Sequence, residues 1–139
     1  MHPLLIDAVS GAILRELFMI GTHVRKEKSL VTTVAGFPDR KPYQLFLGPP
    51  QSAKLHIADD ELAQSAAIIA ERRINLFVHT PYIINLCQAA GTNDDYHTNL
   101  LIKNLQYANT LGCKGVVVHV GKYTDKDKAV AIASIITLV

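Results

Sequence analysis

The chain has 139 residues, of which 49% are hydrophobic, and it carries a formal net charge of +2 with a pI near 8.6. This length allows one domain with a hydrophobic core but excludes a complete eight-stranded βα barrel, which needs roughly 200 residues or more. The composition indicates a folded rather than a disordered protein, and the mild positive charge permits a polyanionic partner without requiring one.

Two cysteines, Cys87 and Cys113, form no CxxC pair and are too few for a disulfide scaffold. They indicate a reducing intracellular compartment, cytoplasm or nucleus, in which both thiols act as small buried apolar groups. The N-terminus has no basic region typical of a secretory signal, and no stretch approaches the roughly 18 apolar residues of a membrane span. We therefore expect no membrane association.

The first third of the chain predicts a helix, a strand and a charged loop. Apolar residues recur at helical spacing in Ile6–Leu17, which predicts a helical extension over residues 1–17. The following run, Phe18–Val24, predicts the first strand of a main domain that comprises residues 18–139. The next loop, Arg25–Lys28, carries three cations that either hold phosphates or simply face solvent.

A short helix and a second strand are expected next. Ser29 is a plausible N-cap for a short helix that ends at Gly36. Pro42–Leu47 predicts a strand, which stops at the rigid loop Gly48–Ser52.

The second half of the chain repeats the alternation of helix and strand. Asp59 or Asp60 is expected to cap one helix, with Arg72 and Arg73 complementing the dipole in its last turn. The expected strands and the second helix follow in this order: strand Asn75–His79, a helix capped by Asn93, Asp94 or Asp95 and closed by Leu111-Gly112, and strand Gly115–Val120.

Four strands alternating with helices predict an α/β fold with a parallel sheet, about half of a TIM barrel preceded by an N-terminal helix. The chain ends on an apolar run, residues 129–139, without a cap, turn or polar tail. We expect this run to be buried by a missing C-terminal half, by self-association or by another partner.

Two strand ends carry the strongest functional signal. Leu76-Phe77-Val78-His79 and Val116-Val117-Val118-His119 each end in histidine, one βα unit apart. Equivalent ends of neighbouring parallel strands meet at one rim, where ligands of parallel α/β folds bind. Imidazole is the commonest metal ligand, so the pair predicts a metal or catalytic site. The histidines at positions 2, 56 and 97 have no predicted role.

Several segments in a fixed order resemble the amino-terminal half of the endonuclease IV family, apurinic/apyrimidinic (AP) endonuclease family 2. They are Ile20-Gly21-Thr22-His23-Val24, Gln44-Leu45-Phe46, His79-Thr80-Pro81-Tyr82-Ile83-Ile84-Asn85-Leu86, and Leu111-Gly112 with Val117-Val118-His119-Val120-Gly121. The resemblance covers most of residues 18–130. The Gly48-Pro49-Pro50 loop is closer to viral and archaeal members, which is compatible with a viral origin.

The resemblance implies a zinc-dependent enzyme of base excision DNA repair that cuts double-stranded DNA 5′ to abasic sites at a cluster of up to three zinc ions. His79 and His119 would be ligands of one zinc, which a carboxylate beyond Val139 would complete. Tyr82 and Asn85 would line the pocket for the abasic sugar. Arg25 and Gln51 would lie on loops that touch the DNA, and many family members place an arginine where this chain has Gln51.

No catalytic residue is assigned by the resemblance, and with two ligands this chain alone is expected to hold zinc weakly and to lack nuclease activity. Two other readings of the sequence stay open. Sugar isomerases and epimerases with the same barrel also place metal ligands on strand ends, although the cations at Arg25–Lys28 favour DNA. The third reading is a non-catalytic half barrel that serves as a structural or interaction module.

Overall fold

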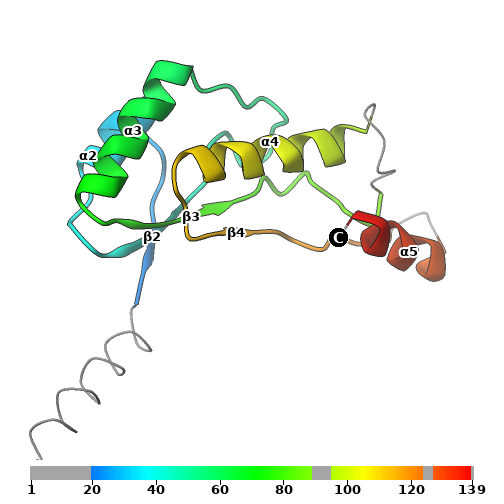
Figure 1. The fold of residues 1–139 in the computed structure, drawn as a ribbon. Helices are drawn as coiled ribbons and strands as arrows, with labels where there is room; N and C mark the ends of the chain where they lie inside the picture. Colours follow the sequence, from blue (N-terminus) through cyan, green and yellow to red (C-terminus); the bar gives the residue numbers. More distant parts are fainter. Residues whose placement is uncertain (1–19, 89–94, 124–126, 139) are drawn as a thin grey trace, which may run out of the picture.

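The computed structural model describes residues 20–88, 95–123 and 127–138, and it contains four strands that alternate with helices. In chain order the elements are β1 (Thr22–His23), α2 (Leu30–Ala35), β2 (Pro42–Leu45), α3 (Asp59–Glu71), β3 (Asn75–His79), α4 (Tyr96–Thr110), β4 (Gly115–Val117) and α5 (Lys128–Leu138) (Figure 1). The expected helical extension over residues 1–17 lies outside the described residues.

The sheet is parallel throughout, and its strands follow one another in the order β1-β2-β3-β4. Each strand therefore pairs with its neighbour in sequence, as successive βα units of a barrel do. The register aligns Gln44 with Phe77 and aligns His79 with Val117. This alignment brings the carboxyl end of β3 beside the chain that leaves β4.

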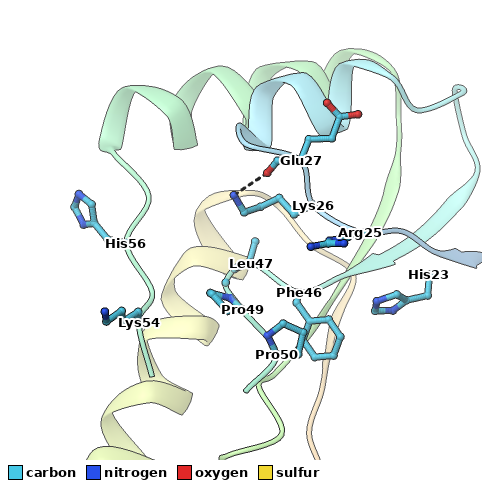
Figure 2. A pocket seen from close by; sticks show the side chains of 11 residues that line it. His23, Arg25, Lys26, Glu27, Phe46, Leu47, Pro49, Pro50, Lys54 and His56 are labelled. Carbon is cyan, nitrogen blue, oxygen red and sulfur yellow. Dashed lines mark hydrogen bonds between the residues drawn. The ribbon is translucent and has the colours of Figure 1, made fainter. Parts of the chain in front are cut away.

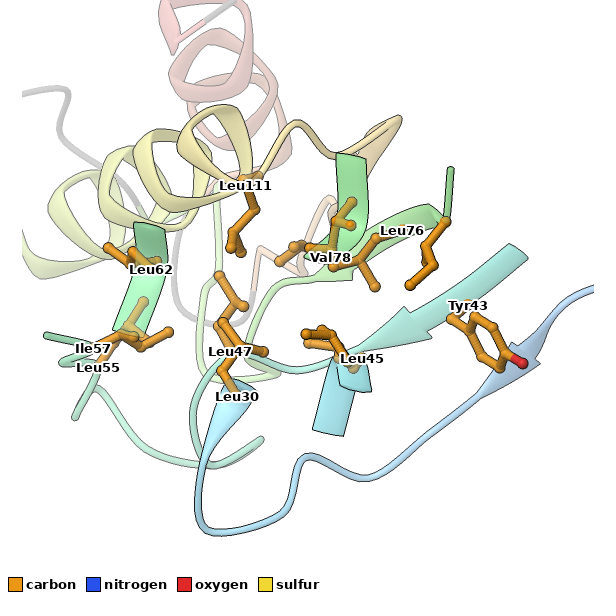
Figure 3. Close-up of a cluster of buried hydrophobic side chains, with 14 of the residues drawn as sticks. Leu30, Tyr43, Leu45, Leu47, Leu55, Ile57, Leu62, Leu76, Val78 and Leu111 are labelled. Atoms are coloured by element: carbon orange, nitrogen blue, oxygen red, sulfur yellow. The ribbon is translucent and has the colours of Figure 1, made fainter. Parts of the chain in front are cut away.

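Helices α2, α3 and α4 all lie over the same side of the sheet (Figure 1). Successive strand residues point to opposite faces, so Tyr43 and Leu45 of β2 share the helix-covered face with Leu76 and Val78 of β3. These side chains are buried in a cluster together with side chains from the helices and the β2 loop, including Leu30, Leu47, Leu55, Ile57, Leu62 and Leu111 (Figure 3). The cluster forms the core.

The opposite face of the sheet carries Gln44 and Phe77, which are only partly buried. His79 follows Phe77 at a spacing of two and therefore also belongs to this face. The strand on which His79 lies is fixed by the core packing of Leu76 and Val78 on its other side. The fold thus presents His79 away from the helices, at the carboxyl rim of the sheet.

Several predicted helix ends are confirmed. The side chain of Ser29 accepts a hydrogen bond from the Thr32 amide, and Asp95 accepts from the amides of His97 and Thr98. Gly36 ends α2, and Gly112 has a φ of +68° just beyond α4, where glycine is favoured.

The predicted cap of α3 is wrong. Its N-cap is Ala58, which makes no side-chain cap bond, and Asp59 and Asp60 lie inside the first turn. There they still interact favourably with the helix dipole, so the acidic pair indicated the right helix start but not the capping residue. Arg72 is the C-cap residue and Arg73 follows it with a φ of +54°, so the arginines lie at and just past the end rather than in the last turn.

Strand ends also differ from expectation by a few residues. The structure ends β2 at Leu45 and β4 at Val117, two and three residues before the predicted ends. The apolar patterns continue past the hydrogen-bonded strands because side chains such as Leu47 are buried even where the backbone no longer pairs. Within the described part of the chain, no helix is long and apolar enough to cross a membrane.

Candidate metal centre

His79 and His119 meet at the carboxyl rim, as the strand-end pattern predicts. Their Nε2 atoms lie 3.1 Å apart, and the ring centroids are 4.9 Å apart with a tilt of 47°. His79 is 8% exposed, whereas His119 is exposed to solvent. The imidazole of His79 is therefore buried, whereas the imidazole of His119 lies at the surface.

A backbone contact selects the tautomer of His79. Its Nδ1 lies 2.7 Å from the carbonyl oxygen of Thr80, which can only accept a hydrogen bond, so Nδ1 carries the proton. In the neutral ring the lone pair then belongs to Nε2, the atom that faces His119. Metal-binding histidines commonly use such a contact to orient the ligating nitrogen.

Aromatic side chains surround the buried imidazole. The rings of Phe46 and Tyr82 lie 4.6 and 5.4 Å from that of His79, and Tyr82 lies 5.5 Å from His119. His23 of β1 is further away, with its ring centroid 6.4 Å from that of His79. The pair is thus open towards solvent on the His119 side and walled by apolar rings on the other.

Main-chain hydrogen bonds hold the surrounding loops in place. The amide of Tyr82 donates to the carbonyl of Pro50, which ties the loop after β3 to the Gly48-Pro49-Pro50 turn. The amide and hydroxyl of Thr80 both donate to the carbonyl of Val117. The loop that follows His79 is therefore bonded to the β2 loop on one side and to the end of β4 on the other.

The two imidazoles fit part of a zinc site. Two nitrogens that each bind zinc at 2.0–2.1 Å in tetrahedral geometry are roughly 3.3 Å apart, close to the 3.1 Å separation of the Nε2 atoms. Zinc needs at least three protein ligands. Among the described residues no group of three or more His, Cys, Asp or Glu side chains is placed to hold a metal. The described residues thus offer two nitrogen atoms at the spacing of zinc ligands.

A cationic cavity lies beside this centre on the same rim (Figure 2). It has a volume of about 530 Å³ and lies between the β1 and β2 loops. Its charged or polar lining side chains are His23, Arg25, Lys26, Glu27, Lys54 and His56. In Figure 2, Lys26 donates to the carbonyl of Glu27, and Phe46 and Pro50 form the lower wall. Such a cavity favours anionic ligands.

The structure brings together only some of the predicted site residues. Tyr82 and Asn85 line a second cavity of about 640 Å³ together with His119. Arg25 belongs to the cationic cavity, whereas Gln51 is an exposed residue that lines neither. Lys28 lines an adjoining hollow with Ser29 and Thr32. This hollow shares Arg25, Lys26 and Glu27 with the cationic cavity.

Three residues at this rim were missed by sequence reasoning. Lys54 and His56 join the cationic cavity from the later part of the β2 loop, which runs from the end of β2 to the start of α3. His97 is buried, and its Nδ1 accepts a hydrogen bond from the amide of Asn85. One indication about His97 was present in the sequence: the predicted N-cap at Asp95 placed it in the first turn of a helix. Nothing in the sequence indicated its contact with Asn85.

Comparison with known proteins identifies relatives of this arrangement. A family model described as "Xylose isomerase-like TIM barrel" matches residues 43–138. A curated protein of Acanthamoeba polyphaga mimivirus with the endonuclease 4 name is 31% identical over 78% of this chain and 37% of its own length. A "Probable endonuclease 4" of Mycobacterium tuberculosis is 32% identical over 77% of this chain and 40% of its own.

The fold comparison agrees with the sequence comparison. The crystal structure of endonuclease IV from Thermus thermophilus matches with a TM-score of 0.63 and 20% identity, covering 85% of this chain and 45% of that one. At this identity the match shows the fold, which confirms the prediction of a partial TIM barrel. The chain spans less than half the length of these relatives.

Proposed function

The chain belongs to the endonuclease IV family of xylose isomerase-like TIM barrels, and on that premise we propose that it serves zinc-dependent hydrolysis of DNA 5′ to abasic sites, in base excision repair. One observation carries the proposal: His79 and His119 face each other through Nε2 at 3.1 Å on the rim that binds ligands in this fold. The whole reaction requires more ligands than the described residues contain.

His79 and His119 are the residues that would hold zinc in this chain. When bound by these residues, zinc would supply positive charge that neutralises the phosphate and lowers the pKa of a water molecule to about 7. The protein's own contribution is to fix the ligands: the Thr80 carbonyl sets the tautomer of His79, and the Phe46 ring limits water on its buried side. Up to three zinc ions are expected in the complete family site.

Tyr82 is the best-placed side chain for the abasic sugar. It is 55% exposed, its ring lies against both imidazoles, and its amide is anchored to Pro50. An exposed ring on a fixed backbone can stack in the space that a missing base leaves. We propose that Asn85 forms the opposite side of this pocket and that Arg25 and Gln51 contact the DNA from the outer loops.

The charge of the rim favours DNA over a neutral sugar. A xylose isomerase-type pocket needs hydrogen-bonding groups for a small polar substrate, whereas Arg25, Lys26 and Lys54 together offer positive charge for a phosphate backbone. We propose phosphate contacts at the cationic cavity, beside the metal pair.

Binding and cleavage of a duplex with one abasic site test this function. We expect the purified chain to bind the abasic duplex more tightly than an intact duplex of the same sequence. Substitution Tyr82→Ala should remove most of this preference, by about 1–3 kcal/mol, while Tyr82→Phe retains it, because stacking needs the ring and not the hydroxyl. Equal affinity for both duplexes would contradict the proposal.

We further propose that this chain alone, with two imidazole ligands, binds zinc weakly and cleaves the abasic duplex at no measurable rate. The same duplex incubated with the chain and added zinc measures this directly. Robust turnover would show that the chain, or two copies of it, supplies a complete metal site.

A further inference from the structure

Asn85 joins the loop after β3 to the loop after β4 through its carboxamide. Its Oδ1 accepts from the amide of Lys122 at 3.1 Å, and its Nδ2 donates to the carbonyl of the same residue at 2.8 Å. The oxygen also accepts from the amide of Cys87 at 3.1 Å. The Asn85 carboxamide thus satisfies both the amide and the carbonyl of Lys122, as a neighbouring strand would do. These two bonds hold the backbone of Lys122 in place.

The lack of a side chain at Gly121 leaves room for this carboxamide. Its φ is +96°, a conformation that residues with a side chain rarely adopt, and a Cβ at this position would overlap the Asn85 Oδ1 atom. A glycine here lets the β4 loop approach Asn85 closely. Gly121 lies two residues after His119, so the close approach occurs immediately beside the exposed imidazole.

Further hydrogen bonds attach the segment on both sides of His119. Before it, the carbonyl of Val117 accepts from Thr80; after it, the carbonyl of Val120 accepts from the Cys87 thiol at 3.8 Å. The bonded part of β4 ends at Val117. His119 therefore depends on these loop contacts, rather than on the sheet, for its position.

His97 fixes Asn85 from the other direction. The Asn85 amide donates to His97 Nδ1 at 3.1 Å, and His97 is buried in the first turn of α4, where Asp95 caps the helix. A continuous hydrogen-bonded chain thus runs from the start of α4 through Asn85 to Lys122. It couples a helix that packs on the core to the loop that carries a metal ligand.

We propose that Asn85 is a positioning residue: its carboxamide, seated against Gly121 and backed by His97, holds the β4 loop so that His119 Nε2 faces His79 Nε2. This role is additional to the sugar contact proposed above. It rests on the proposed function only in naming zinc as the ligand that the two imidazoles share. Side-chain truncation at Asn85 is expected to release His119 without removing either ligand.

The test compares Asn85→Ala with a matched asparagine elsewhere. Asn75 lies at the start of β3, on the opposite rim, and its Nδ2 also donates to a backbone carbonyl, that of Arg40. Nuclear Overhauser effects between the His79 and His119 rings report their proximity without any metal. We expect the inter-ring signal to disappear in Asn85→Ala and to persist in Asn75→Ala. The two variants are compared under conditions in which both have lost a similar amount of unfolding free energy.

Zinc titration followed by the same imidazole signals gives a second readout. Asn85→Ala should weaken zinc binding about tenfold, the lower end of the effect of removing a residue that orients a ligand. Gly121→Ala, which displaces the carboxamide from the partner loop, should lose the inter-ring signal too, so the test survives if one variant fails to fold.

Retention of the inter-ring signal in Asn85→Ala, or its equal loss in Asn75→Ala, would overturn the positioning role. If the unaltered chain shows the inter-ring signal but no response to zinc, the metal proposal fails while the positioning role stands. The two failures are therefore distinguishable.

Discussion

The Nε2 atoms of His79 and His119 lie 3.1 Å apart although forty residues separate them in the chain. A parallel sheet with consecutive strand order brings the ends of β3 and β4 to the same rim, and His119 lies two residues past the end of β4. The core beneath β3 fixes one ring and loop contacts fix the other. Two imidazoles that are oriented before any ligand arrives lose less freedom on binding a metal, which supports the zinc site proposed at this rim.

Lys54 should contribute to DNA affinity without affecting sequence preference. Removal of its charge in Lys54→Ala is expected to weaken binding to any duplex. It should also reduce the salt slope, which is the slope of log affinity against log salt concentration, by about 1 in magnitude, because one fewer phosphate is neutralised. Fluorescence anisotropy with a labelled duplex over a range of salt concentrations measures both effects.

Lys114→Ala is the matched control for this charge. Lys114 lines a hollow at the opposite end of the sheet, near the start of β4. The same loss of charge there should leave the salt slope nearly unchanged. Equal slopes for the two variants would show that net charge, rather than the cationic cavity, governs binding.

The order of elements and the histidine pair were predictable from sequence because both depend on local pattern. Asn75–His79 was predicted with the observed bounds. The helix end before this short apolar run and the proline after it leave few alternative positions for the strand ends. The location of His119 at the same rim then followed from the geometry of parallel strands, although the register pairs His79 with Val117 rather than with His119.

Leu45 should be essential to the core. It is fully buried in the middle of the sheet, so Leu45→Ala is expected to lower the free energy of unfolding by about 2–5 kcal/mol. Leu105→Ala, at a position on α4 that is 45% exposed, should change it by only about 0.5 kcal/mol. Urea denaturation of both variants measures the contrast, and similar losses would contradict the assigned core.

Cys113 should make stability fall at alkaline pH. Burial raises the pKa of its thiol from 9.0 to about 12. Because the folded pKa lies above the unfolded one, the neutral thiol contributes fully below pH 9, and the contribution is lost as pH rises towards about 12. Wild type should therefore lose more unfolding free energy across this range than Cys113→Ala does.

Alkylation gives an independent check of this thiol. At a pH below 9 the protonated sulfur should react slowly in the folded chain and at an ordinary rate in urea. A fast reaction of Cys113 in the native protein would show that the thiol is not held in an apolar environment.

Contacts between loops were not predictable from the sequence. Lys54 and His56 reach the cationic cavity through the course of the β2 loop, and the course of the β3 loop brings Asn85 to His97. Local pattern carries no signal for such contacts. Gly121 was visible only as a loop glycine, because its requirement for positive φ depends on where the Asn85 carboxamide lies.

The pairing of His79 and His119 at one metal is tested most directly by zinc titration followed through the imidazole nitrogens in long-range ¹H–¹⁵N spectra. We expect that the Nε2 signals of both rings shift together, and that His119→Ala abolishes the response of His79. Independent responses of the two rings, or a response confined to other histidines, would contradict a shared site.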